Sequence, residues 1–335
     1  MNAIQTSACL GVAAAALALA ACSGSGTNGA TPSADASATA TPAASTAAPN
    51  PSASATASAS APAASALPAF TPPPASAIPD DQFGAMVRKG RDIFTDTQKY
   101  ARQYVGNGLN CENCHLDAGR RPNSAPLWAA YGRYPRYRSK NDKVDTYAER
   151  LQGCFRFSMN GKAPPTDGEI ITALTAYSYW LATGAPTGKN LKGYGYPTQG
   201  FKPAEPPSYA RGETVYDKNC ALCHGGDGQG QKVAAEYVFP PLWGPESFNW
   251  GAGMGSIKNA AAFIKANMPF SRGGTLSDQD AWDVAYFMDA HERPQDPRFT
   301  GNVAATRKKY HDSQWSLYGK EVNGRVLGSG GSGGE

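Results

Sequence analysis

The chain has 335 residues, with 31 Lys and Arg against 27 Asp and Glu and a formal net charge of +4. This length favours two domains, or one domain with long tails, over a single compact domain. The small charge excess argues against a nucleic-acid-binding protein, and the apolar run at residues 11–21 is too short to span a membrane.

The first 80 residues are expected to carry export and anchoring signals. Residues 1–21 are typical of a signal peptide with an Ala/Leu-rich centre, although no Lys or Arg precedes that centre. Residues 19–22 resemble the bacterial lipoprotein processing site, in which Cys22 becomes the lipidated first residue. Residues 22–80 are rich in Pro, Ala, Ser and Thr, which predicts an extended tether or a tolerated low-complexity insertion. We therefore expect a periplasmic lipoprotein, anchored to a membrane through Cys22.

Two C-x-x-C-H motifs follow the tether. In the motif that attaches c-type haem, two thiols bond to the porphyrin and the adjacent imidazole coordinates iron. A redox-active cysteine pair or half of a zinc site is the alternative. Because two copies occur in a chain with an export signal, we expect two covalently bound c-type haems. The residues are Cys111, Cys114 and His115 in the first motif and Cys220, Cys223 and His224 in the second.

The segments around the two motifs also repeat, which indicates a duplicated domain. Each motif follows a helix with a Gly-x-x-x-aromatic pattern, precedes a Pro-Leu-Trp triplet, and is followed later by an aromatic-rich helix. The pairs are Gly90/Phe94 with Gly212/Tyr216, residues 126–128 with 241–243, and residues 169–181 with 280–291. This order is similar to the small cytochrome c fold. The predicted fold is mainly α, with two fused cytochrome c-like domains that each enclose a covalent haem. The predicted bounds are 81–200 for the first, catalytic domain, 201–300 for the second, electron-transfer domain and 301–335 for a C-terminal tail.

Each haem iron needs a ligand opposite its histidine. In the second domain Met268 lies 44 residues after His224 (268 minus 224) and is the predicted ligand, with Met254 and Met288 as competitors. A thioether ligand raises the haem potential. In the first domain two readings stay open at this point: Met159 has the same spacing from its histidine, yet Cys154 is the unassigned thiol of this domain. A buried cysteine is often only a small apolar residue.

Residues 149–162, which surround Cys154, resemble the di-haem c-type thiosulfate dehydrogenases, which can also work as tetrathionate reductases. The resemblance extends over most of residues 83–292. It implies that Cys154 ligates the first haem and that the reaction takes place beside it. Some relatives have lysine directly before the haem-two methionine. This chain has Asn267 there and Lys265 two residues further back, so His224 and Met268 are the expected pair.

The implied reaction couples two thiosulfate dianions to tetrathionate and passes two electrons to an external redox protein such as a cytochrome c. At about 4 Å, two unit like charges repel by roughly 4 kcal/mol in an effective dielectric of about 20. The site must therefore supply cations, and arginine suits multi-oxygen anions because its planar donors are directed. Arg150 and Ser158, each four residues from Cys154, and Lys162 are the candidates. Other nearby cations, for which a solvated face is the alternative, are Arg120, Arg121, Arg133, Arg136, Arg138, Lys140, Lys143 and Arg156.

The leading alternative function is a non-catalytic di-haem electron carrier in which Met159 ligates the first haem. Its basic face would bind an acidic redox partner. A zinc-bound interaction module is a third interpretation.

Overall fold

The computed structural model describes residues 67–234 and 236–330. The predicted signal peptide, Cys22 and most of the predicted tether lie outside these residues. Within the two described ranges, no helix is both long and apolar enough to cross a membrane.

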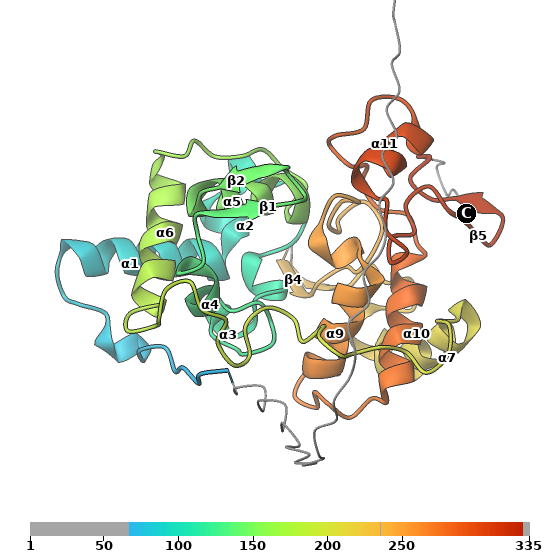
Figure 1. Ribbon diagram of the computed structural model, residues 1–335, viewed down its shortest axis with the longest axis horizontal. Coiled ribbons are helices and arrows are strands. Elements are labelled where there is room, and N and C mark those ends of the chain that lie inside the picture. The colour runs from blue at the N-terminus through green and yellow to red at the C-terminus, as the bar shows by residue number, and fades with distance from the viewer. Residues whose placement is uncertain (1–66, 235, 331–335) are drawn as a thin grey trace, which may run out of the picture. The chain divides into compact units, whose positions relative to one another are not determined.

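The first domain is built on two crossing helices, α1 (Gln82–Thr95) and α6 (Glu169–Leu181) (Figure 1). The Asp81 carboxylate accepts a hydrogen bond from the Gly84 amide and starts α1. At the crossing, a side chain on Gly90 would place its Cβ 2.0 Å from the Ala173 carbonyl oxygen. Only glycine lets the two backbones approach this closely.

Short elements connect α1 to α6. The β1–β2 hairpin is antiparallel and pairs Tyr137 with Val144. The elements in chain order are α2 (Thr97–Tyr100), α3 (Leu116–Gly119), α4 (Leu127–Tyr131), β1 (Arg136–Arg138), β2 (Lys143–Asp145) and α5 (Tyr147–Gly153).

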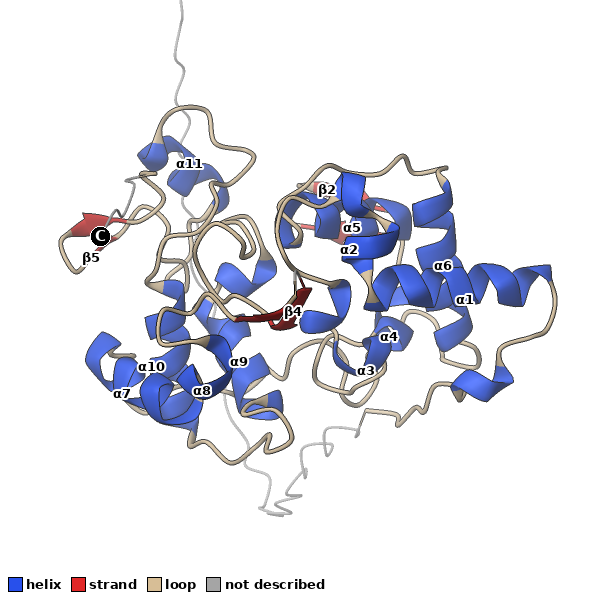
Figure 2. Cartoon of the chain, turned by 180° about the vertical axis from the view of Figure 1, so that it is seen from behind, coloured by secondary structure: helices blue, strands red, loops and turns tan. Residues whose placement is uncertain are grey.

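The second domain repeats this arrangement with α7 (Tyr209–Asn219) crossing α10 (Asp278–Asp289). A Cβ on Gly212 would lie 2.1 Å from the Asp283 carbonyl oxygen, so the glycine repeat marks the same close helix crossing in both domains. Helices dominate both domains, and the strands form only two-stranded hairpins (Figure 2). The remaining elements of this domain are α8 (Ala221–His224), β3 (Gln231–Val233), β4 (Glu236–Phe239) and α9 (Ile257–Asn267).

The segment after residue 300, expected as a tail, is folded over most of its described length. It carries α11 (Val303–Tyr310) and the hairpin of β5 (Glu321–Val322) with β6 (Arg325–Val326). Tyr318 is fully buried and stacks on His311, with ring centroids 4.3 Å apart. Tyr318 also packs edge to face on Trp250, 5.7 Å away, and Trp315 packs on Trp282, 4.7 Å away, so the segment is held against the second domain.

The described end of the predicted tether also packs on a domain. The Phe70 ring lies 5.4 Å from the Trp128 ring, and the Lys192 amide donates to the Pro68 carbonyl oxygen. The first domain therefore includes residues that the composition assigned to the tether.

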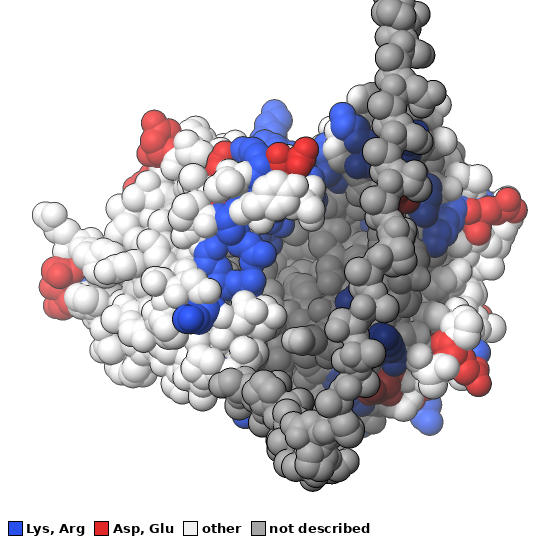
Figure 3. Space-filling model, viewed as in Figure 1, with Lys and Arg blue, Asp and Glu red and all other residues white. Residues whose placement is uncertain are grey.

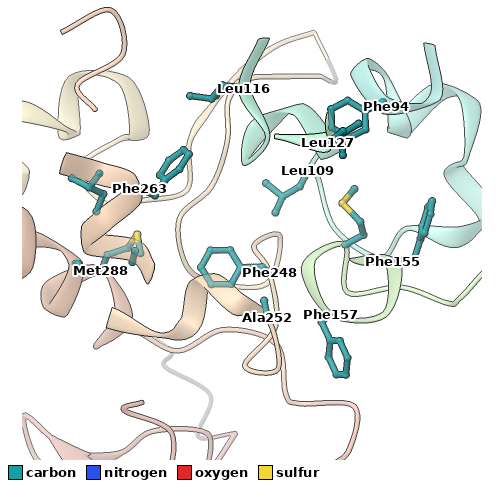
Figure 4. Close-up of a cluster of buried hydrophobic side chains, with 14 of the residues drawn as sticks. Phe94, Leu109, Leu116, Leu127, Phe155, Phe157, Phe248, Ala252, Phe263 and Met288 are labelled. Carbon is teal, nitrogen blue, oxygen red and sulfur yellow. The ribbon is translucent and has the colours of Figure 1, made fainter. Parts of the chain in front are cut away.

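One buried apolar cluster extends through both domains. Figure 4 shows Leu109 and Phe248 between the Phe94 and Leu127 side chains of the first domain and the Phe263 side chain of the second. This cluster brings the two C-x-x-C-H motifs close together.

Candidate active site

The second C-x-x-C-H motif lines a cavity of about 350 Å³. Cys220, Cys223 and His224 face this cavity, and most of its other lining residues are apolar. This size and lining are typical of a cofactor site. The donor set and the cavity therefore fit a covalently held haem.

The predicted ligand Met268 lines the same cavity, and so do its competitors Met254 and Met288. Met268 follows directly after the end of α9, while Met288 is 4% exposed within α10. The Lys265 ammonium donates to the Leu276 carbonyl oxygen at 2.5 Å and lies 3.0 Å from the Asp278 carboxylate. Neither Leu276 nor Asp278 lines the cavity, so these contacts hold the Lys265 ammonium away from it.

Both motif histidines are fixed in the same way. His115 Nδ1 lies 2.7 Å from the Ala125 carbonyl oxygen, and His224 Nδ1 lies 2.9 Å from the Pro240 carbonyl oxygen. A carbonyl oxygen can only accept a hydrogen bond, so each Nδ1 carries the proton and each Nε2 is left as a metal ligand. The accepting carbonyls belong to the residues directly before the two Pro-Leu-Trp triplets, which explains why these triplets repeat.

The electrostatic surroundings keep the first of these imidazoles neutral. Burial lowers the pKa of His115 to about 4, and the charge of Arg150 adds to this effect. The hydrogen bond to Ala125 by itself would raise the pKa. Metal coordination requires the neutral form of histidine, so the environment of His115 suits a residue that would hold an iron ion.

Cys154 lies at the start of a π-helical turn (Cys154–Ser158) that continues α5. The Met159 amide donates to the Cys154 carbonyl oxygen at 3.0 Å, five residues back. Such turns are rare and are frequent at functional sites. Arg150, one turn earlier in α5, donates to the Cys154 sulfur at 2.8 Å. The electrostatic effect of Cys154 is the largest influence on Arg150 and raises its pKa, although burial alone would lower it.

The Cys154 sulfur also lies near the first haem motif. Burial, followed by the charge of Cys154, raises the pKa of the Cys114 thiol to about 12. The Met159 side chain is 2% exposed, and its backbone carbonyl accepts from the Gly106 amide. The charge of Cys154 acts on both Cys111 and Cys114, so its sulfur lies beside the first C-x-x-C-H motif.

Two cations of the β1–β2 hairpin join Arg150. Arg138 lies close enough to Arg150 and Cys154 for their charges to affect its pKa, although burial is the largest influence and lowers it. Lys140 donates to the Gly251 carbonyl oxygen, and its ammonium lies 3.9 Å from the centre of the Phe157 ring. Figure 3 shows Lys and Arg gathered over this part of the first domain. Of the many cations between the first motif and Cys154, the β1–β2 hairpin therefore brings Arg138 and Lys140 close to Arg150.

The other two predicted anion-binding residues are less close to the thiol. The Ser158 backbone carbonyl oxygen accepts a hydrogen bond from the Asn107 side-chain amide at 2.8 Å. This contact involves the backbone of Ser158 and not its hydroxyl group. The Lys162 side chain is exposed. Among the described residues, Arg150 is the candidate that directly contacts Cys154.

The first motif also forms part of the wall of the second cavity. Glu112, Asn113 and Cys114 line that cavity together with Cys220 and His224. The two candidate haem positions are therefore neighbours, which suits electron transfer between them.

Two residues of this region were not selected from the sequence. Burial, followed by the charge of Cys114, raises the pKa of Tyr196, and its ring packs edge to face on Phe263, 5.7 Å away. Arg298 lies near the end of the second domain, with its guanidinium carbon 4.9 Å from the centre of the Phe157 ring. Neither residue belongs to a sequence motif. The sequence therefore carried no signal that either one lies in this region.

Comparisons with known proteins agree with this architecture. The SoxA/TsdA cytochrome c domain model matches residues 96–187, and the model described as cytochrome c oxidase, cbb3-type, subunit III matches residues 207–288. These matches confirm the predicted fold class of two cytochrome c domains.

Relatives and a solved structure extend the similarity to most of the chain. The thiosulfate dehydrogenase of Thiomonas intermedia (strain K12) is 64% identical over 77% of this chain and 82% of its own length. The thiosulfate dehydrogenase of Stutzerimonas stutzeri (strain A1501) is 59% identical over 78% of this chain and 85% of its own length. The solved thiosulfate dehydrogenase TsdBA from Marichromatium purpuratum superimposes with a TM-score of 0.75 at 50% identity, covering 80% of this chain and 58% of that one. With its two cytochrome c domains and these relatives, the chain belongs to the thiosulfate dehydrogenase family of c-type cytochromes.

Proposed function

We propose that the protein couples two thiosulfate ions to one tetrathionate ion and passes two electrons to an external acceptor. A sulfur–sulfur bond forms between the two outer sulfurs, and the four negative charges of the reactants become two on the product plus two electrons. The names of the relatives support the substrate. The reverse reaction, tetrathionate reduction, uses the same site when the acceptor is replaced by a donor.

The observation that carries this proposal is the 2.8 Å contact between the Arg150 guanidinium and the Cys154 sulfur. It places a sulfur atom, a directed anion-binding group and the first C-x-x-C-H motif in one small region. An electron carrier needs no buried cation beside an additional thiol.

The residues that would hold the two haems are the cysteines and histidines of the two motifs. Cys154 is the proposed distal ligand of the first haem and Met268 that of the second. A bound haem supplies a site that takes up one electron at a time. A thiolate ligand stabilises ferric iron whereas a thioether raises the potential, so this ligand pair favours electron flow from the first position to the second.

The cations give the first thiosulfate its position. Arg150 would direct the oxygens of thiosulfate with its planar donors, while the nearby Arg138 adds to the positive potential. This attraction offsets the repulsion between two dianions, which is the main electrostatic barrier to coupling. The outer sulfur of the bound ion then faces Cys154. Ser158 and Lys162 are retained as further proposed contacts of the substrate oxygens.

The test is a direct assay of purified holoprotein with thiosulfate and ferricyanide, in which tetrathionate is measured. Cys154→Ala should lower turnover by at least about a hundredfold, as loss of a group central to the reaction does, while both covalent haems stay attached. Haem content is checked by the absorption of the denatured protein under reducing conditions. Wild-type protein that forms no tetrathionate would be an electron carrier instead.

Met159→Leu is the matched variant for the competing ligand assignment. An exchange of Met for Leu conserves volume and costs less than about 1.5 kcal/mol in a core. We expect near-normal turnover and an unchanged haem spectrum, since Met159 packs beside the site without ligating iron. Loss of a thioether signature in this variant would instead identify Met159 as the ligand.

We also propose that the protein is exported and held at a membrane by a lipid on Cys22, and that its acceptor is a soluble cytochrome c-like protein. Support comes from the sequence of residues 1–22. Cys22→Ser should move the protein from the membrane fraction to the soluble periplasmic fraction of the cell. Equal membrane association of the variant and the wild type would contradict the anchor.

A further inference from the structure

Arg298 is fixed by a buried polar cluster that joins the end of the second domain to the segment after residue 300. Its Nε and one terminal nitrogen donate to the two oxygens of Asp296 at 2.9 and 2.6 Å. His311 Nε2 lies 2.8 Å from the same carboxylate, and His311 Nδ1 lies 3.4 Å from the Ser316 hydroxyl. Burial alone raises the pKa of Asp296, but the hydrogen bonds from Arg298 and His311 lower it well below its usual value.

This cluster directs Arg298 toward the first domain. Its guanidinium carbon lies 4.9 Å from the centre of the Phe157 ring, and the Lys140 ammonium lies 3.9 Å from the same ring centre. Phe157 belongs to the π-helical turn of Cys154. Two cations from distant parts of the chain therefore meet at one aromatic ring, three residues from the proposed reaction centre.

The packing around this ring is tight. A Cβ on Gly251 would lie 2.4 Å from a Phe157 ring carbon and 3.1 Å from an Asp296 carboxylate oxygen. The Gly251 carbonyl oxygen accepts from the Lys140 ammonium. Both cations are thus held by defined contacts, which lowers the entropic cost of binding an ion between them.

The charges near Phe157 do not cancel. Among the described residues, Arg298 pairs with Asp296 while Lys140 makes no ion pair with an acid, so the two cations carry one more charge than the acid beside them. Burial, followed by the charges of Arg298 and Arg150, lowers the pKa of Lys140, so both arginines lie near it. A half-buried cation without a counterion is unfavourable in the isolated protein and marks a place where an anion binds.

We propose that Lys140 and Arg298 form a second anion-binding subsite for a thiosulfate-type sulfur oxyanion, next to the Arg150–Cys154 subsite, and that Asp296 positions Arg298 in it. This inference rests on the proposed function, because coupling requires two thiosulfate ions at the same time. The first ion takes the Arg150 subsite and the second takes the Lys140–Arg298 subsite. The repulsion between the two dianions is offset by cations from both sides.

The experiment is calorimetric titration of thiosulfate into full-length holoprotein without an electron acceptor and without oxygen, so that no sustained turnover occurs. We expect two bound thiosulfate ions per wild-type chain and one in Arg298→Gln and Lys140→Gln. In the ferricyanide assay the half-saturating thiosulfate concentration should rise by roughly tenfold in both variants, the size of effect given by loss of one charge-assisted hydrogen bond. Lys140→Gln is needed because it leaves the Arg298–Asp296 pair intact.

Lys308→Gln is the matched control, because it removes one exposed positive charge from α11. It should bind two ions with wild-type affinity. Arg298→Lys should recover part of the affinity, and Asp296→Asn should weaken the second ion although no cation is lost. These two results separate positioning from mere loss of charge or of fold.

One bound ion in the wild type, or two bound with unchanged affinity in either Gln variant, would overturn the second subsite. Failure of the proposed function is a different result, since it is the absence of tetrathionate from the wild-type assay. The two outcomes are therefore measured separately.

Discussion

Lys140 is the residue from which we expect a pH response of thiosulfate binding. Burial, followed by the charges of Arg298, Arg150 and Arg138, lowers the pKa of Lys140 to about 7, and Asp296 partly opposes this. Lys140 is therefore charged below about pH 7 and neutral above it, whereas thiosulfate stays a dianion. Between about pH 6 and about pH 8 the half-saturating thiosulfate concentration should rise by about tenfold, since one pKa unit is a tenfold change in an equilibrium.

Lys140→Arg is the control for this prediction, because a guanidinium keeps its charge over the whole range. Steady-state rates at constant ionic strength should then show a flat half-saturating concentration in the variant. The same rise with pH in Lys140→Arg as in the wild type would assign the response to another group.

At the scale of elements, each domain depends on one helix crossing through a glycine. In Gly212→Ala the new Cβ would lie 2.1 Å from the Asp283 carbonyl oxygen, so α7 and α10 must move apart. Overpacking of this kind costs about 1–3 kcal/mol. Urea denaturation followed by circular dichroism should show that loss in the free energy of unfolding.

Gly253→Ala is the matched substitution, because Gly253 is exposed and no atom lies within 4 Å of the added Cβ. Its free energy of unfolding should change by less than about 0.5 kcal/mol. If the two alanine variants were equally stable, the close crossing would not limit stability.

At the scale of the whole molecule, buried amides join the domains. The Asn249 amide donates to the Arg156 carbonyl oxygen and to the Asn160 side-chain oxygen, both at 3.0 Å, and Asn249 is fully buried. Asn249→Ala leaves these acceptors unsatisfied, which costs about 1–3 kcal/mol. Because Arg156 lies in the π-helical turn, the half-saturating thiosulfate concentration should rise as well.

Thermal denaturation and the ferricyanide assay test this prediction together. Asn259→Ala serves for comparison, since it removes a hydrogen bond to the Gly253 carbonyl oxygen that lies within the second domain. We expect this variant to lose little stability and no thiosulfate affinity. A loss of affinity in Asn259→Ala equal to that in Asn249→Ala would show that contact between the domains does not shape the anion site.

The sequence by itself determined the two cytochrome c domains, because the evidence for them is local. The residues of each C-x-x-C-H motif and of each Pro-Leu-Trp triplet lie within five consecutive positions, and each paired glycine lies four residues before its aromatic partner. The same holds for Arg150, whose position four residues before Cys154 in a helix predicted the contact that the structure shows.

Only the tertiary structure decided which other cations join Cys154 and how the chain ends. Arg138 and Lys140 approach through the bend of the β1–β2 hairpin, while Lys162 stays exposed. Arg298 lies near the predicted end of the second domain, and the segment after residue 300, expected as a tail, folds because Tyr318 and its neighbours bury apolar surface. Contacts between residues this far apart depend on how loops close and domains pack, and local periodicity carries no information about either.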